Sequence, residues 1–263
     1  MKFRQIISLQ ILFFLTFITL KGQDTPTIQH KISLRNGSVI HGKLLSKDEQ
    51  TIIILKQQDT ILLDANQVLS MEQKEIPTAE GIASAARKVS KKGHPPVHLW
   101  DPPFCGNLDI RIARDGTWYY LGSPIGRFEL VKLFSSILRK DEDKYFLVTP
   151  AEKVGIKVDD APFVAVDFSV VGNGNNQTLI FETHVGDTVK LNNENPLRVT
   201  IDQNSGEPKP YIHIRSGLEA LIDRKSFYRL IEICSIKTHN KEEWFGICSN
   251  KNFFPIILAS ELS

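Results

Sequence analysis

The stretch TWYYLGSPIGRFELVKLF, residues Thr117–Phe134, decides how most of the chain is organised, because a shorter form of it returns as GLEALIDRKSFYRLIEI, residues Gly217–Ile233. In each stretch an Ile-x-Arg triplet precedes apolar residues at the spacing of a helix. The repeat predicts a duplicated domain with a seam between its halves. The residues that correspond in this alignment are Ile125 with Ile222, Arg127 with Arg224, Leu130 with Phe227, and Leu133 with Leu230.

Strands and a helix are predicted around each copy. In the first copy, two alternating strands flank the Asp115-Gly116 turn, and Ser123 with Pro124 fits the cap and first position of a helix. In the second copy, strands at LRVTI and PYIHIR precede a helix for which Asp223 is the expected cap.

The chain starts like an exported protein. Lys2 and Arg4 precede an uncharged run from Ile6 to Leu20, which is short for a spanning helix of about 20 residues. We therefore predict a signal peptide over residues 1–22 and a periplasmic or extracellular location. A membrane anchor, formed by the same segment left uncleaved, is the alternative.

A small β-module is predicted for residues 24–73, because short β-branched runs alternate there with turn signals such as Asn36-Gly37. That dipeptide favours a type I′ turn, and Gly42 indicates a bulge. The glycines stand where Sm-like and SH3-like barrels carry theirs, so the module resembles such barrels. A protein partner could contact residues 31–72, and an accessory module without a site is the alternative.

The rest of the chain divides into three predicted segments. Small and basic residues predict a linker over residues 74–95, so the chain from about residue 96 is expected to fold without what precedes it. The first repeat unit is predicted to span residues 96–192 and the second residues 193–263.

Composition and cysteines exclude several classes of protein. The 32 basic and 30 acidic residues leave a net charge of +2, which gives no strong signal for nucleic acid, and no membrane contact is predicted beyond the N-terminal segment. Cys105, Cys234 and Cys248 cannot all pair, and they lack the C-x-x-C spacing of a zinc site. We predict free thiols, with a bridge between Cys234 and Cys248 as the alternative.

Four motifs between Pro96 and Ile257 resemble, in this order, the bacterial family known as domain of unknown function 1285. They are WDPPFCGNLDIRIARDGTWYYLGSPIGRFELVKLF, YFLVTPAEKVGIKVDDAPFVAV, PYIHIRSGLEALIDRKSFYRLIE and EEWFGICS. The resemblance implies a domain duplication, a C-terminal half superficially similar to pleckstrin-homology barrels, and a junction site for a nucleotide-like molecule in signalling. The signal-like N-terminus and the added β-module depart from the family's pattern and from a cytosolic role.

The predicted fold class is therefore α+β and β-rich: a small β-barrel-like module, then a duplicated sheet-plus-helix unit whose second half is pleckstrin-homology-like. The predicted ligand site lies at the seam between the units, where cations could hold an anion and aromatic rings could cover a base or sugar. Its residues are Trp118, Arg127, Lys153, Tyr211, Arg215 and Arg224. For the two repeated arginines, bonds to carbonyls or an acid of a neighbouring strand are the structural alternative.

No enzyme signature supports a named reaction. The loop VGNGNNQ lacks the helix that would receive a phosphate, and no H-E-x-x-H or G-x-S-x-G pattern occurs, so no catalytic residue, metal or cofactor is predicted. We predict a ligand-binding or interaction protein for an anionic, nucleotide-like small molecule. An enzyme that uses Glu152 and the arginines on a phosphorylated or acidic substrate is one alternative, and an envelope scaffold acting through the β-module is another.

Overall fold

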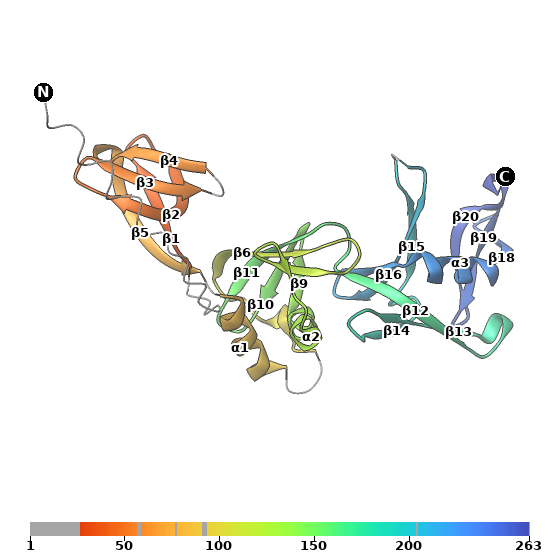
Figure 1. Ribbon diagram of the computed structural model, residues 1–263. Coiled ribbons are helices and arrows are strands. Elements are labelled where there is room, and N and C mark those ends of the chain that lie inside the picture. The colour runs from red at the N-terminus through yellow and green to blue at the C-terminus, as the bar shows by residue number, and fades with distance from the viewer. Residues whose placement is uncertain (1–26, 57–58, 77, 91–93, 204, 263) are drawn as a thin grey trace, which may run out of the picture.

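The structure, a computed structural model, describes residues 27–56, 59–76, 78–90, 94–203 and 205–262, so the predicted signal peptide lies outside the described residues. Figure 1 shows a small sheet at the N-terminal end, followed by a larger body of curled sheets with α-helices on them. The predicted α+β, β-rich class is confirmed.

The N-terminal module is a five-stranded antiparallel sheet with the strand order β4-β3-β2-β1-β5. Its strands are β1 (Thr27–Leu34), β2 (Val39–Lys47), β3 (Thr51–Lys56), β4 (Asp59–Asp64) and β5 (Val68–Ile76), and a 3-10 turn, η1 (Ala65–Gln67), joins the last two. Ile32, Ile52 and Ile54 are the centre of a small core that belongs to this module alone. The predicted meander is present, and the likeness to Sm-like and SH3-like barrels stays a prediction.

Both glycine predictions for this module need correction. In the Asn36-Gly37 turn only Gly37 has a positive φ, 85°, whereas a type I′ turn needs a positive φ at both residues. The strand register shifts between Leu44 and Ser46 and not at Gly42. Gly42 is required for a different reason, because a Cβ there would lie 2.2 Å from the Ile54 side chain.

The predicted linker contains a helix, α1 (Ala79–Val89), whose N-cap is Thr78. The Thr78 hydroxyl accepts a hydrogen bond from the backbone of Gly81, which satisfies one free amide of the first turn. One face of α1 packs against α2 and into the core of the larger body. Figure 1 shows the two helices near each other on the body. The buried residues of this face are Ala79, Ile82, Ala83 and Ala86. This part of residues 74–95 is therefore a packed element of the body.

The first sheet of the body has six strands in the order β8-β7-β6-β11-β10-β9. Its elements are β6 (Phe104–Ile112), β7 (Trp118–Tyr120), β8 (Ser123–Pro124), α2 (Phe128–Ser136), β9 (Leu138–Asp141), β10 (Lys144–Val148) and β11 (Lys153–Val158), preceded by the 3-10 turn η2 (Val97–Leu99). Two antiparallel three-stranded meanders, one before and one after α2, are joined where β6 runs parallel to β11.

Ser123 and Pro124 do not start the helix as predicted. Leu121 and Gly122, with φ values of 49° and 75°, form a tight turn that folds the next two residues back onto β7. The helix begins only at Phe128, and Arg127 occupies the N-cap position without a capping side-chain bond.

The second sheet also has six strands, in the order β14-β13-β12-β17-β16-β15, and its parallel pair is β12 with β17. Helix α3 and a separate three-stranded sheet of order β18-β19-β20 follow it. The elements are β12 (Phe163–Val171), η3 (Gly174–Asn176), β13 (Thr178–Thr183), β14 (Thr188–Lys190), β15 (Leu197–Ile201), β16 (Pro208–Arg215), β17 (Leu218–Ile222), α3 (Arg224–Glu232), β18 (Ser235–His239), β19 (Glu242–Ser249), β20 (Asn252–Leu258) and η4 (Ala259–Glu261). The sheets change between Val158 and Phe163, whereas the predicted boundary at residues 192 and 193 lies between two strands of one sheet.

The order of elements recurs along the chain, but the way in which their strands pair into sheets does not. A three-stranded meander, a nine-residue helix and another three-stranded meander run from β6 to β11 and again from β15 to β20. In the first run the meanders share one sheet; in the second they belong to different sheets, because β17 pairs with β12 instead. The repeated helix of the opening motif is thus real, while a duplicated sheet unit is not apparent from the pairing.

The two helices correspond with a register one residue away from the predicted one. Helix α2 ends at the cap Ile137 and α3 at the cap Ile233, with similar backbone angles. Counted from the helix starts, the buried Val131 and Phe134 match the buried residues of α3, in place of the predicted Leu130 and Leu133. Asp223 caps α3 as predicted, through a 2.7 Å bond from the Ser226 amide.

One hydrophobic core runs through the whole body. It includes buried residues of α1, of both six-stranded sheets, of α2 and α3, and of the last sheet, from Ala79 to Phe254. The seam between the predicted units is therefore largely packed interior, and an accessible site has to lie where side chains leave space at its edges.

Candidate functional site

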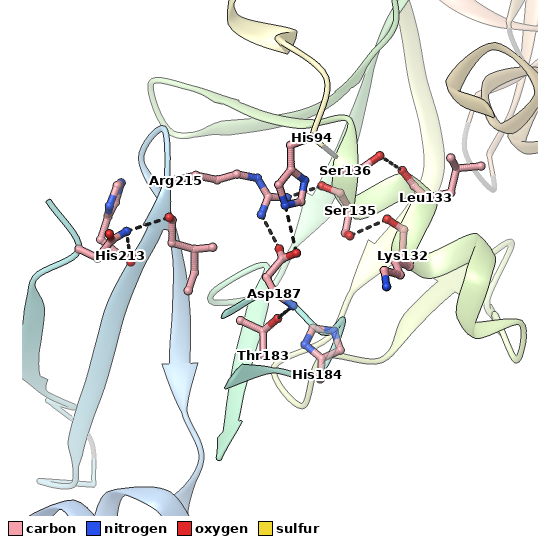
Figure 2. A network of polar contacts seen from close by, with 12 residues as sticks. His94, Lys132, Leu133, Ser135, Ser136, Thr183, His184, Asp187, His213 and Arg215 are labelled. Carbon is pink, nitrogen blue, oxygen red and sulfur yellow. Dashed lines mark hydrogen bonds and ion pairs between the residues drawn. The ribbon is translucent and has the colours of Figure 1, made fainter. Parts of the chain in front are cut away.

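A polar network connects the two sheets of the body at one edge of their junction. Figure 2 shows His94 and Arg215 converging on Asp187, which lies in the turn between β13 and β14. The Asp187 carboxylate is 3.1 Å from His94 Nε2, and it accepts a hydrogen bond of 2.5 Å from Arg215 Nη1. Arg215 Nη2 also donates to the backbone oxygen of Ser135 in α2, at 2.7 Å. The network therefore ties α2 and His94, before the first sheet, to the second sheet.

Arg215 is held on several sides. Its guanidinium lies 5.0 Å from the ring centroid of Phe163, and 20% of the side chain is exposed. A planar guanidinium can bond a carboxylate and a carbonyl and also stack on a ring, which the ammonium of a lysine does not reproduce. The arginine thus uses its donors within the protein and shapes the site without facing solvent freely.

Asp187 is ionised under ordinary conditions. Burial raises its pKa, but the hydrogen bond from His94 and the charge of Arg215 outweigh burial and lower the pKa from 3.8 to about 2. Because the folded pKa is the lower one, the stability that this carboxylate contributes is present above pH 3.8 and is lost as the pH falls through about 2.

Beside this network lies a cavity of about 320 Å³, called here the junction cavity. Its walls come from the end of α1, from α2 and from the turn between β13 and β14 that holds Asp187. The lining residues are Ser90, His94, Glu129, Lys132, Leu133, Ser135, Ser136 and Asp187.

Hydroxyl groups and one lysine give the junction cavity its chemistry. Ser136 donates its hydroxyl proton to the Leu133 carbonyl at 2.7 Å, so the 3.1 Å contact with Ser90 leaves Ser90 as the donor of that pair. Lys132 is exposed, and its Nζ comes close to Gly186, where an added Cβ would be 3.9 Å away. Within the described part of the chain, Lys132 is the cation of this cavity that has no carboxylate within ion-pair distance.

The structure brings only Arg215 of the predicted site residues to this network. Trp118 is 1% exposed and stacks on Phe134, so it belongs to the core. Arg127 is an exposed residue whose nearest carboxylate, that of Glu80, is 3.9 Å away.

The other predicted residues are paired elsewhere. Lys153 donates to Asp141 at 2.5 Å and lies over the Phe146 ring, rather than pairing with the neighbouring Glu152. Tyr211 donates its hydroxyl to Asp160 at 2.7 Å. Arg224 bonds Glu207 at the edge of a different cavity.

The two repeated arginines, Arg127 and Arg224, differ in the contacts that they make. Arg127 makes no carbonyl contact in the described structure, whereas Arg224 bonds an acid, Glu207, that directly precedes β16. Bonds from an arginine to backbone carbonyls are made instead by Arg215, to Ser135, and by Arg139, to Val97 and Trp100.

His184 gives the junction a pH-dependent stability. Its Nδ1 accepts a hydrogen bond from the Val164 amide at 3.1 Å, so the ring is neutral, with its proton on Nε2 beside Gly116. Burial of the ring lowers its pKa below 6.5, because it disfavours the charged form. As the pH falls below 6.5, the unfolded chain takes up a proton that the folded chain does not, so stability is lost until the folded pKa is reached.

We expect the free energy of unfolding to depend less on pH in His184→Asn, because the amide oxygen of asparagine still accepts a hydrogen bond from Val164 but does not titrate. Urea unfolding at pH 7.5 and pH 5 measures it, with the exposed His98→Asn as the matched control. A slope that changes equally in both variants would contradict the assignment to His184.

The family of the chain follows from its comparison with known proteins. The N-terminal domain described as "Domain of unknown function (DUF1285)" matches residues 95–161, and the C-terminal domain of the same family matches residues 162–256. The chain belongs to the DUF1285 family. The two family domains meet where the first six-stranded sheet ends and the second begins, so the junction cavity of this DUF1285 protein lies between them.

Two solved structures are similar to this DUF1285 protein. A DUF1285 family protein from Silicibacter pomeroyi DSS-3, at 2.50 Å resolution, is 56% identical with a TM-score of 0.64, over 69% of this chain and 97% of that one. A DUF1285 family protein from Shewanella baltica OS155, at 1.40 Å, is 28% identical with a TM-score of 0.39, over 48% and 91%. No curated protein matches the chain.

The remaining observations concern the cysteines, metal ligands and membrane spans. Cys105, Cys234 and Cys248 are free thiols, as predicted. Across the described ranges, no group of three His, Cys, Asp or Glu side chains is placed to hold a metal. None of the helices in the described residues is long and apolar enough to cross a membrane.

Proposed function

We propose that this DUF1285 protein binds a small anionic molecule, nucleotide-like or a sugar phosphate, in the junction cavity. The observation that carries the proposal is Lys132, a cation of the cavity that has no ion pair among the described residues. Two carboxylates also line the cavity: Arg215 neutralises Asp187, and Glu129 lies on α2 three residues before Lys132. An ammonium group without an ion pair can donate charge-assisted hydrogen bonds to a phosphate oxygen. The serine hydroxyls of the cavity already donate within the protein, so they would have to turn to reach a ligand.

The surrounding network suits a binding role. Arg215 neutralises Asp187 beside the cavity and bonds the backbone of α2, so it fixes the walls without competing for the ligand. In this proposal Arg215 positions the walls of the cavity, and Lys132 contacts the ligand. A ligand that binds only the folded chain raises its stability in proportion to the logarithm of ligand concentration.

The experiment is a calorimetric titration of the full chain with AMP, glucose 6-phosphate and inorganic phosphate. Lys132→Ala is expected to weaken binding by about 1.5 to 3 kcal/mol, the range for a hydrogen bond to a charged group. Lys144→Ala is the matched control, since Lys144 is an exposed lysine on β10 and outside the cavity. Absence of heat with every anion, or full affinity in Lys132→Ala, would refute the proposal.

A contact role for the N-terminal module is a second proposal. Leu45, Leu62 and Leu69 of its sheet are 50%, 69% and 64% exposed, and they would favour a protein partner where they form one contiguous apolar surface. Export of the chain stays a prediction beside it.

A further inference from the structure

A second cavity, of about 310 Å³, lies beside the start of α3 and shares no lining residue with the junction cavity. We call it the proline cavity, because Pro208 and Pro210 of β16 form part of its wall. Phe227 and Tyr228 of α3 add aromatic surface, and 60% of Tyr228 is exposed. The volume is at the small end of the range for ligand pockets, roughly 300 to 1,000 Å³, so the space suits one small molecule with an apolar body.

Charges of both signs stand around this apolar surface. Arg114 reaches it from the turn between β6 and β7, and Arg224 and Glu207 reach it from the second sheet and its helix. Asp223 also lines the cavity, where its carboxylate accepts the capping hydrogen bond from the Ser226 amide. A purely anionic ligand would meet Glu207, and a purely cationic one would meet the two guanidinium groups. A molecule that carries a carboxylate and an ammonium group close together matches both signs at once.

The charged groups can exchange their present partners for a ligand. Arg224 donates to Glu207 at 2.5 Å, but their side chains are 69% and 55% exposed. Exposed ion pairs of this kind contribute little to stability, so opening the pair for a ligand has a small cost in free energy. A guanidinium binds a carboxylate through two parallel hydrogen bonds, which a ligand carboxylate can form as well as Glu207 does.

Arg114 is positioned by a chain of contacts beneath the cavity. Its Nε is 3.3 Å from Asp160, and the same carboxylate accepts a hydrogen bond from the hydroxyl of the buried Tyr211 on β16. Asp160 lies in the short segment between the two six-stranded sheets, so it holds an arginine of the first sheet against the second. This explains how a residue from a distant turn comes to line the cavity.

We propose that the proline cavity binds a free α-amino acid with an apolar side chain. Its carboxylate is held by Arg224 and Arg114, its ammonium group by Glu207, and its side chain lies against Phe227, Tyr228 and the prolines. This site goes beyond the proposed function, since it is a different cavity with a ligand of different charge.

The experiment is calorimetric titration of the full chain with L-phenylalanine and L-leucine, and with phenylacetate and phenethylamine, which keep the ring but carry only one of the two charges. We expect the amino acids to bind at least tenfold more tightly than either singly charged compound. Arg224→Gln and Glu207→Gln should each weaken L-phenylalanine binding at least tenfold and leave the melting temperature within about one degree, because both side chains are exposed.

Arg87→Gln is the matched control, because Arg87 forms a similarly exposed pair with Glu80 on α1, outside the cavity. Lys132→Ala should bind L-phenylalanine normally, which separates this site from the junction cavity. Failure of all amino acids to bind, equal affinity for phenylacetate and L-phenylalanine, or unchanged affinity in Arg224→Gln would each overturn the proposal.

Discussion

Removal of residues 1–94 is expected to abolish cooperative unfolding, whereas removal of residues 1–77 is expected to preserve it. The two shortened chains differ by α1, whose Ile82, Ala83 and Ala86 are fully buried in the core of the body. Loss of the helix exposes the facing side of α2 to water. The match to the family starts at residue 95, so a chain cut at that limit would lack an element of its own core.

A single substitution in α1 measures how strongly the stability of the body depends on this helix. Ile82→Ala should destabilise the full chain by about 2 to 5 kcal/mol, the range for removing a large aliphatic side chain from a packed core. Leu69→Ala, which truncates a leucine that is 64% exposed in the N-terminal module, is the control and should change stability by less than about 1 kcal/mol. Chemical unfolding followed by fluorescence gives both values. A cooperative transition in the chain from residue 95 would show that α1 is dispensable.

The second large effect is expected for Arg215→Ala, which should lower the free energy of unfolding by about 2 to 4 kcal/mol. The substitution leaves the largely buried carboxylate of Asp187 without its cation and the Ser135 carbonyl without its donor. Arg215→Lys should recover only part of the loss, since one ammonium group does not reproduce the bond to the carboxylate and the bond to the carbonyl together.

A double-mutant cycle tests the pairing directly. The double variant Asp187→Asn with Arg215→Ala should lose less stability than the sum of the losses in the two single variants. The reason is that it has no unpaired carboxylate charge at residue 187. Additive losses would mean that the two side chains act independently, and the ion pair would not be the cause.

The local elements of the fold could be predicted from the sequence, and their long-range pairing could not. Helical spacing and the Asp223 cap located α3, and alternation located the strands. Helix α1 was hidden because Ile82 is its one large buried side chain, so small residues resembled a linker. The one-residue register difference between the helices arose because arginines stand near both helix starts, which favoured aligning Arg127 with Arg224 rather than with the cap Asp223.

The candidate site was accessible to sequence reasoning in part. Arg215 was selected as a cation near the repeated motif, and it does lie at the junction. Asp187 and His94 were missed because they are far from it in the sequence and belong to no periodic pattern. Lys132 was missed because a single exposed lysine on a helix carries no signal until its neighbours from another sheet are known.

The way the six-stranded sheets are assembled has a consequence for the order of folding. Each sheet consists of two meanders whose contacts are close in the sequence, joined by one parallel pair whose strands are far apart, such as β6 with β11. Closing a long loop costs entropy before any contact repays it, so local hairpins form faster than distant pairs. We therefore expect the hairpin amides to become protected early in pulsed hydrogen exchange and the parallel seams to close last. Until then, the edges of β6 and β11 stay open, which makes that interval the period in which the chain is most exposed to pairing with another copy of itself.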